Sequence, residues 1–217
     1  MSSRTAARVE LSQTFYGPTQ TIDTADYAGI SLEGSEAPFK DLDPTDVTKL
    51  RSGKTRQGVL MRNVSGVTAY KGMAVSSDSG YEGKRFDGFT KVTAAACAGV
   101  INDQLNSAGC RNGDMCWVIV EGPNLCYSQN TEGDAWSIGD FVFAQTAASS
   151  TANTVGGTTA DDGGKIAARD ASLTCSDAES TDGTLAKIIK NGLGRALSAC
   201  TTAETNTLKL VDLNIQV

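Results

Sequence analysis

The fold is decided by one stretch, Asn112-Gly113-Asp114-Met115-Cys116-Trp117-Val118-Ile119-Val120-Glu121. Its first three residues are a turn signal, because Asn and Gly accept the positive φ that tight turns require. The six apolar residues that follow are rich in β-branched and aromatic types. They end at Glu121-Gly122-Pro123, which predicts a strand with a clean stop. Because this strand is apolar on both faces, it is either a central strand covered on both sides or a strand at a subunit interface.

Further strands are predicted on both sides of this stretch. Residues 58–64 and 67–75 are apolar runs separated by Ser65-Gly66, and they predict a hairpin. At the C-terminus, apolar residues alternate with polar ones, which is the period of a half-buried strand. The apolar positions of that strand are Val211, Leu213, Ile215 and Val217.

A loose internal repeat relates two parts of the chain. Gly99-Val100-Ile101, a polar loop and the strand at 115–120 resemble Gly192-Leu193-Gly194, a polar loop and the strand at 208–215. No segment has the pattern of a long amphipathic helix. The sequence therefore predicts a mainly β fold, a small β-barrel or β-sandwich over residues 58–217, in which the repeat favours two similar β units.

The N-terminal residues lack the regular apolar patterns of the rest of the chain. Residues 1–57 carry isolated apolar side chains without a sustained period, so we expect an extended N-terminal arm that becomes ordered on a partner surface. Within the arm, residues 43–50 predict one helical turn, with Asp43 as N-cap and Pro44 at the first position. Residues 145–164 are Ala, Ser, Thr, Gly and Asn, and we expect a mobile loop there.

Composition argues against several function classes. The chain has 217 residues and a formal net charge of −6, with no clustered basic run of the kind that contacts nucleic-acid phosphates. No apolar stretch approaches the ~20 residues that span a bilayer, and the first residues lack the apolar core of a signal peptide. We therefore expect no direct nucleic-acid partner, no membrane partner, and synthesis in a cytoplasm.

Motifs that would carry chemistry are incomplete. The chain has no His, which excludes Ser-His-Asp and Cys-His catalytic sets. Gly53-Lys54-Thr55 lacks the first glycine and the strand of a phosphate-binding loop. Gly192-x-Gly194 lacks the third glycine of a dinucleotide site and is expected to be a tight β turn. Asp161-Asp162-Gly163-Gly164 misses the ligand alternation of a calcium loop. We expect a non-enzymatic protein with no catalytic, cofactor or metal residues.

The six cysteines contain no Cys-x-x-Cys pair, so a zinc site is not indicated. We expect buried reduced thiols that behave as small apolar residues. Their even number leaves disulfides open if the finished protein leaves the cell, and Cys110 with Cys126, which flank the 115–120 strand, would then be the favoured pair.

The order of these motifs resembles the capsid decoration (cement) proteins of tailed bacteriophages. The resemblance spans residues 58–217 and leaves the arm uncovered. It rests on the following motifs, in order: Arg62-Asn63-Val64-Ser65-Gly66, Lys71-Gly72-Met73-Ala74-Val75, Gly99-Val100-Ile101, Asn112-Gly113-Asp114, Trp117-Val118-Ile119-Val120-Glu121-Gly122-Pro123, Ile138-Gly139-Asp140-Phe141-Val142, Gly192-Leu193-Gly194-Arg195-Ala196-Leu197 and Leu208 to Ile215.

The resemblance implies a virion structural protein on the capsid exterior, a homo-trimer that binds the major capsid protein and stabilises contacts between its subunits. The arm would supply the capsid contact, with aromatic anchors, because aromatic side chains carry a large share of interface energy. The predicted interface residues are Phe15, Tyr16, Tyr27, Phe39 and Trp117, of which Trp117 is a core or interface anchor rather than a ligand platform.

Two other functions fit the same composition. A phage tail-tube or head–tail joining protein also uses β modules with arms, but it usually carries a helix packed on the sandwich. A small carbohydrate-binding β-sandwich would need exposed aromatic residues in its loops, and residues 145–164 contain none.

Overall fold

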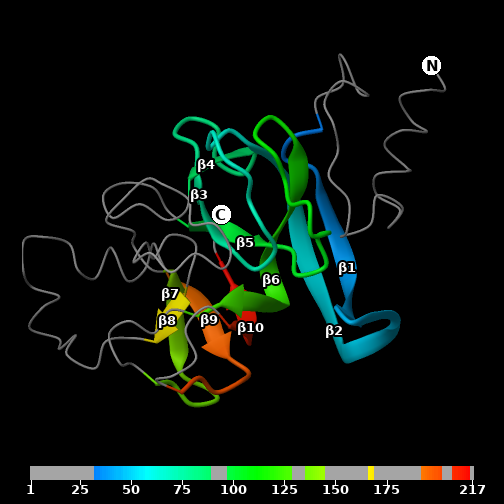
Figure 1. Ribbon diagram of the computed structural model, residues 1–217, viewed down its shortest axis with the longest axis vertical. Helices are drawn as coiled ribbons and strands as arrows, with labels where there is room; N and C mark the ends of the chain where they lie inside the picture. The colour runs from blue at the N-terminus through cyan, green and yellow to red at the C-terminus, as the bar shows by residue number, and fades with distance from the viewer. Residues whose placement is uncertain are drawn as a thin grey trace, which may run out of the picture.

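The computed structural model describes residues 32–88, 97–128, 135–144, 166–168, 192–201 and 207–215. These residues form a mainly β fold, as predicted, without a helix (Figure 1). Their strands are β1 (Glu36–Asp43), β2 (Asp46–Asn63), β3 (Ala74–Ser77), β4 (Arg85–Gly88), β5 (Cys97–Ile101), β6 (Met115–Tyr127), β7 (Phe141–Ala144), β8 (Ile166–Ala168), β9 (Gly192–Ala196) and β10 (Leu208–Asn214).

Five strands close into a first ring. Its order is β2-β4-β3-β5-β6, and β6 returns to pair with β2. The pairing of β2 with β4 is parallel, with Asn63 opposite Phe86, and the other pairings are antiparallel. A closed ring leaves none of its strands as a free edge.

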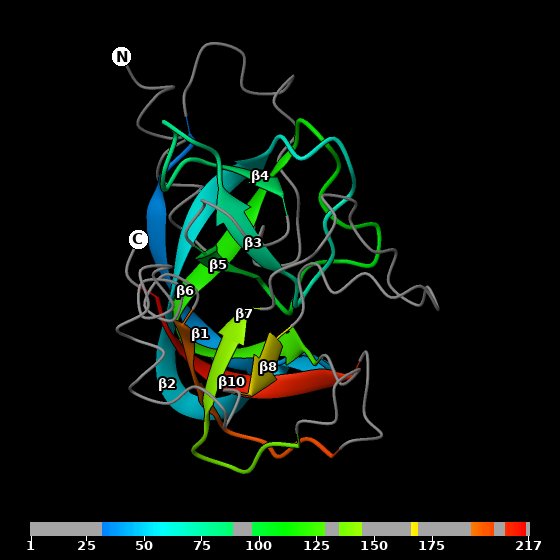
Figure 2. The same ribbon diagram turned by 90° about the vertical axis from the view of Figure 1, so that its left-hand side faces the viewer.

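The second half of β6 starts another ring. It pairs with β10, and β10, β9, β7 and β8 follow as antiparallel neighbours. A parallel bridge from Ile166 in β8 to Ser128, just after β6, returns to the first strand. Figure 2 shows β7, β8 and β10 below β3, β4 and β5, so the two rings lie one above the other and share β6.

The two rings repeat one pattern of pairing. Strands β2 to β6 (unit 1) correspond in order to β6 to β10 (unit 2), and the parallel pair Asn63–Phe86 corresponds to Ser128–Ile166. The turns before β3 and β7 are also equivalent. Gly72 N–H donates to Ile101 O at 2.9 Å, and Gly139 N–H donates to Ala196 O at 2.8 Å. Gly99 and Gly194 hold equivalent places in β5 and β9. The repeated strands noted in the sequence therefore occupy equivalent positions.

Strand β6 is covered on both faces, which confirms the prediction that its apolar run is a central strand covered on both sides. Cys116, Val118 and Val120 belong to a core cluster with contributions from all five strands of the first ring. Met115, Trp117 and Ile119 point the opposite way, into a second cluster shared with β1 and with unit 2. Period-2 alternation places successive side chains in different cores, so every position must be apolar.

The predicted boundary at residue 57 falls inside β2, so residues 36–57 belong to the sheet and not to an arm. The predicted helical turn is also wrong. The carboxylate of Asp43 accepts hydrogen bonds from the N–H and the hydroxyl of Thr45, and this local turn reverses the chain into a hairpin. Residues 1–31 and the predicted mobile loop at 145–164 lie outside the described residues.

Two further sequence interpretations are corrected. The predicted hairpin of residues 58–75 does not form, because β4 pairs with both β2 and β3 and lies between them. Gly192-x-Gly194 is not a turn but part of β9. At Gly194, with φ 155°, a Cβ atom would lie 1.9 Å from the Asp212 carbonyl oxygen, so the glycine is needed for close approach of β9 to β10.

Candidate functional site

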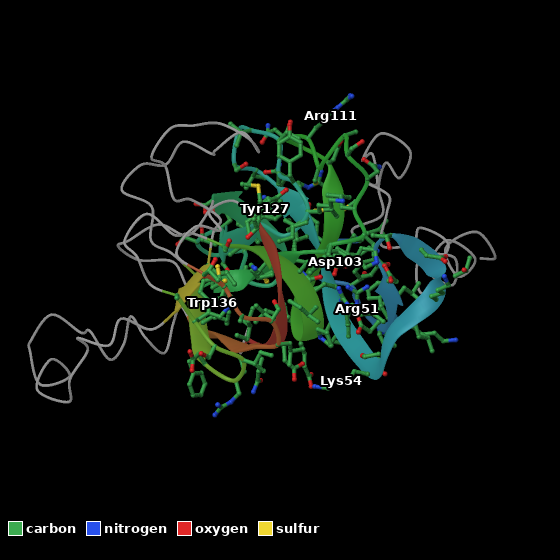
Figure 3. All side chains as sticks on the ribbon, turned by 60° about the horizontal axis from the view of Figure 1, so that its bottom comes forward. Arg51, Lys54, Asp103, Arg111, Tyr127 and Trp136 are labelled. Carbon is green, nitrogen blue, oxygen red and sulfur yellow. The ribbon has the colours of Figure 1, made fainter. Side chains whose placement is uncertain are left out.

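Four charged side chains meet where β1 and β2 approach the segment after β5. We call Asp41, Arg51, Arg56 and Asp103 the Arg–Asp cluster; Figure 3 shows Arg51 and Asp103 side by side next to the β1–β2 hairpin. Arg51 Nη2 lies 2.5 Å from Asp41 Oδ1, and Arg51 Nη1 lies 2.8 Å from Asp103 Oδ2. Arg56 Nη1 donates to Asp103 Oδ1 at 2.7 Å. The cluster thus joins three separate segments through charged contacts.

Backbone and amide groups hold Asp103 in place. Its N–H donates to Asn124 Oδ1 at 3.2 Å, and Leu125 N–H donates to Asp103 Oδ2 at 3.1 Å. Asn124 lies in β6 just after Gly122-Pro123, where β6 leaves the first ring and enters the second. The cluster therefore lies at the junction of the two units.

The cluster is neutral overall, with two arginines against two aspartates. The side chains of Asp41, Arg56 and Asp103 are fully buried. Burial lowers the pKa of Arg51, but hydrogen bonds and charge from Asp41 and Asp103 outweigh that effect, and its net pKa is raised. Both carboxylates are paired with arginine side chains, so we interpret the cluster as a structural junction.

The two core clusters hold different thiols: Cys110 and Cys116 lie in the core of the first ring, and Cys97, Cys126 and Cys200 lie in the second core cluster. Cys97, Cys110, Cys116, Cys126 and Cys200 are buried and free, so the suggested Cys110–Cys126 disulfide is wrong. The physical reason is that Cys110 lies in the core of the first ring and Cys126 in the second core cluster. Burial raises the pKa of Cys97 to about 12, which keeps this thiol protonated and unreactive.

Two of the predicted interface residues meet inside the chain. The rings of Phe39 and Trp117 pack edge to face with centroids 4.9 Å apart, and both side chains are buried. They are therefore core residues, and Phe39 is not an exposed anchor. Phe15, Tyr16 and Tyr27 lie outside the described residues.

The exposed large apolar side chains in the described part of the chain include none of the predicted interface residues. Among the described residues they are Leu50 (60%), Tyr81 (45%), Ile138 (70%) and Phe141 (49%). Ile138 and Phe141 flank the Gly139-Asp140 turn, and apolar residues on both sides of a polar turn were the available signal. The guanidinium of Arg195 lies 4.1 Å from the centre of the Phe141 ring, and its Nη1 donates to Gly139 O at 3.0 Å. We call Ile138, Gly139, Phe141 and Arg195 the turn patch.

Comparisons with known proteins assign no family. No protein-family model matches the sequence, and no curated protein matches it.

The described residues contain neither a metal-binding cluster nor a membrane-spanning helix. In the described part of the chain, no group of three or more His, Cys, Asp or Glu side chains is placed to hold a metal ion. None of the described residues belongs to a helix long and apolar enough to cross a membrane. The features that remain are the Arg–Asp cluster inside the molecule and the exposed apolar side chains on its surface.

Proposed function

We propose that this chain is a non-enzymatic structural protein that binds the outer surface of a phage capsid and stabilises contacts between major capsid subunits. It would act as a homo-trimer on the exterior of the virion. The order of strand and turn motifs, which resembles that of capsid decoration proteins, carries the proposal.

The way the molecule is built supports this role. Both rings have interiors filled with apolar side chains, and the buried Arg–Asp cluster fixes the β1–β2 hairpin to the junction of the two units. Removing one partner from a buried ion pair is strongly destabilising, so the cluster opposes separation of the hairpin from the junction. A module joined in this way, with apolar side chains on its surface, suits a protein that bridges neighbours on a lattice.

We assign the capsid contact to residues 1–31, because residues 36–57 are part of the sheet. This segment keeps three of the predicted anchors, Phe15, Tyr16 and Tyr27. Aromatic side chains at such a contact would supply most of the binding energy.

The test is co-sedimentation with capsids that lack their decoration protein, taken from the virus that encodes this chain. Three proteins are compared: the full chain, a deletion of residues 1–31, and a full-length variant with Phe15, Tyr16 and Tyr27 replaced by Ala. We expect the full chain to saturate the capsids and both altered proteins to stay in the supernatant, with unchanged thermal unfolding. If the full chain does not bind, the capsid role is wrong. If the deletion binds as well as the full chain, the role stands and the contact lies on the β body.

A further inference from the structure

The two units differ in how an equivalent turn is covered. In unit 1 the turn before β3 lies against unit 2: Tyr127 N–H donates to Gly72 O at 3.0 Å, and a Cβ atom on Gly72 would meet the Leu208 side chain at 2.7 Å. In unit 2 the turn before β7 is open, because a Cβ atom on Gly139 would have no neighbour within 4 Å among the described residues. The same backbone turn is therefore a docking surface in one unit and exposed in the other.

Exposure alone would favour polar side chains at the open turn and apolar ones at the covered turn, but the larger apolar side chains are at the open turn. The covered turn of unit 1 carries Lys71 and the fully buried Ala74. The equivalent positions in the open turn of unit 2 are Ile138 and Phe141, which are 70% and 49% exposed. The open end of a repeat ordinarily needs a polar outer face for solubility. A larger apolar surface at the open turn indicates that a partner covers it.

The chain offers a matching surface elsewhere. Leu50, 60% exposed, lies near the tip of the β1–β2 hairpin, where Asp43 and Asp46 are also found. Hydrogen bonds from the Thr45 side chain lower the pKa of Asp43, and those from Thr48 lower the pKa of Asp46, so both carboxylates are charged at neutral pH. Lys49 pairs with Asp46 at 2.9 Å, which leaves the tip acidic by one charge. This tip is apolar and acidic, and the turn patch is apolar and carries Arg195.

Within one molecule the two surfaces do not meet. Figure 1 shows the β1–β2 hairpin and the turn before β7 on opposite sides of the same end of the molecule. A contact between different surfaces of two copies is heterologous, and it repeats from copy to copy until a ring closes or a chain grows.

We propose that the turn patch of one copy receives the β1–β2 hairpin tip of a second copy, with Leu50 packed on Ile138 and Phe141. The acidic tip faces Arg195. This contact does not rest on the proposed capsid role, because it needs only copies of this chain.

The test is sedimentation velocity of the purified full chain over a range of concentrations, with Leu50→Asp and Ile138→Asp as the variants. Tyr81→Asp is the matched control, since Tyr81 is an exposed aromatic residue on a different surface. We expect the unaltered chain and the control to associate as concentration rises, and each of the two variants to associate about tenfold or more weakly. Thermal unfolding shows whether each variant is folded, and Leu50→Ser and Ile138→Ser replace any that is not.

Mixing the two variants gives the decisive result. The Leu50→Asp protein keeps its turn patch and the Ile138→Asp protein keeps its hairpin tip, so the mixture should form pairs while each variant alone stays a single chain. Three results would overturn the inference: an unaltered chain that is monomeric throughout, variants that associate like it, or a mixture that forms no pairs. A chain that binds capsids but remains monomeric in solution would refute this contact and leave the proposed function intact.

Discussion

Unit 1 and unit 2 share their strand order, their register and the hydrogen bonds of their equivalent turns. They differ in the side chains at equivalent positions and in which turns are buried. The position of Ala69 in unit 1, bridged to Cys110, is taken by Trp136 in unit 2, bridged to Cys200. Trp136 also donates its ring N–H to Ser198 O at 3.0 Å. The two units therefore share their backbone pairing, while the side chains at equivalent positions and the segments that cover them differ. Substitutions at the junction of the units, at a shared glycine position and at the two equivalent turns test this comparison.

The largest effect is expected at the junction of the units. Replacing Arg56 by Met leaves the buried carboxylate of Asp103 without one of its two charged partners, and loss of a partner from a buried pair costs about 3–5 kcal/mol. The measurement is the free energy of unfolding in urea. Lys54→Met is the matched control. Its partner Asp212 is 2.5 Å away, but the Lys54 side chain is exposed and that of Asp212 is only half-buried, so we expect a loss within about 1 kcal/mol. Equal losses for the two variants would mean that the buried Arg–Asp cluster contributes no more to stability than a surface ion pair.

The next effect tests a feature that the units share. A Cβ atom on Gly194 would lie 1.9 Å from Asp212 O, and one on Gly99 would lie 2.4 Å from a Val118 methyl group. We expect Gly194→Ala and Gly99→Ala each to lower the unfolding free energy by about 3 kcal/mol, since both residues also have positive φ. Gly53→Ala is the control, because a Cβ atom there meets nothing within 4 Å in the described part of the chain, and we expect a change of about 0.5 kcal/mol or less. A tolerated substitution at one site alone would show that the units are not equivalent there.

The sequence was informative where side-chain pattern alone decides structure. The apolar run of β6 and the alternation in β10 predicted strands, and Val211 and Leu213 are buried as expected. Sequence could not show that β4 lies between β2 and β3, because a parallel pairing between distant strands leaves no local pattern. It also misassigned Phe39, since an isolated aromatic residue has the same pattern in an arm and in an edge strand. The Arg–Asp cluster was missed because Asp103 lies 52 residues from Arg51 and 47 from Arg56 in the chain.

A smaller effect separates the two equivalent turns. Gly72 and Gly139 both have positive φ, so replacement by Ala strains the backbone in each by about 1 kcal/mol. Gly72→Ala must also displace Leu208 and approach the Leu125 carbonyl oxygen at 3.0 Å, which we expect to add about 2 kcal/mol. The measurement is again the unfolding free energy, at a concentration where the chain is monomeric. Equal losses would mean that unit 2 does not press on the turn of unit 1.

The smallest effect is a pH dependence that reports how well unit 2 covers unit 1. Cys97 points out of the first ring into the second core cluster, and burial raises its pKa from an ordinary 9.0 to about 12. Between these values the unfolded chain loses the proton that the folded chain keeps, so stability is retained below pH 9 and falls as pH rises toward 12.

The measurement compares the unaltered chain with Cys97→Ala at pH 8 and pH 10. One pH unit above 9, this thiol should cost about 1.4 kcal/mol, so the variant should lose less stability than the unaltered chain by about that amount. If the two proteins lose stability equally, Cys97 ionises in the folded chain, and the outer face of unit 1 is open to solvent instead of covered by unit 2.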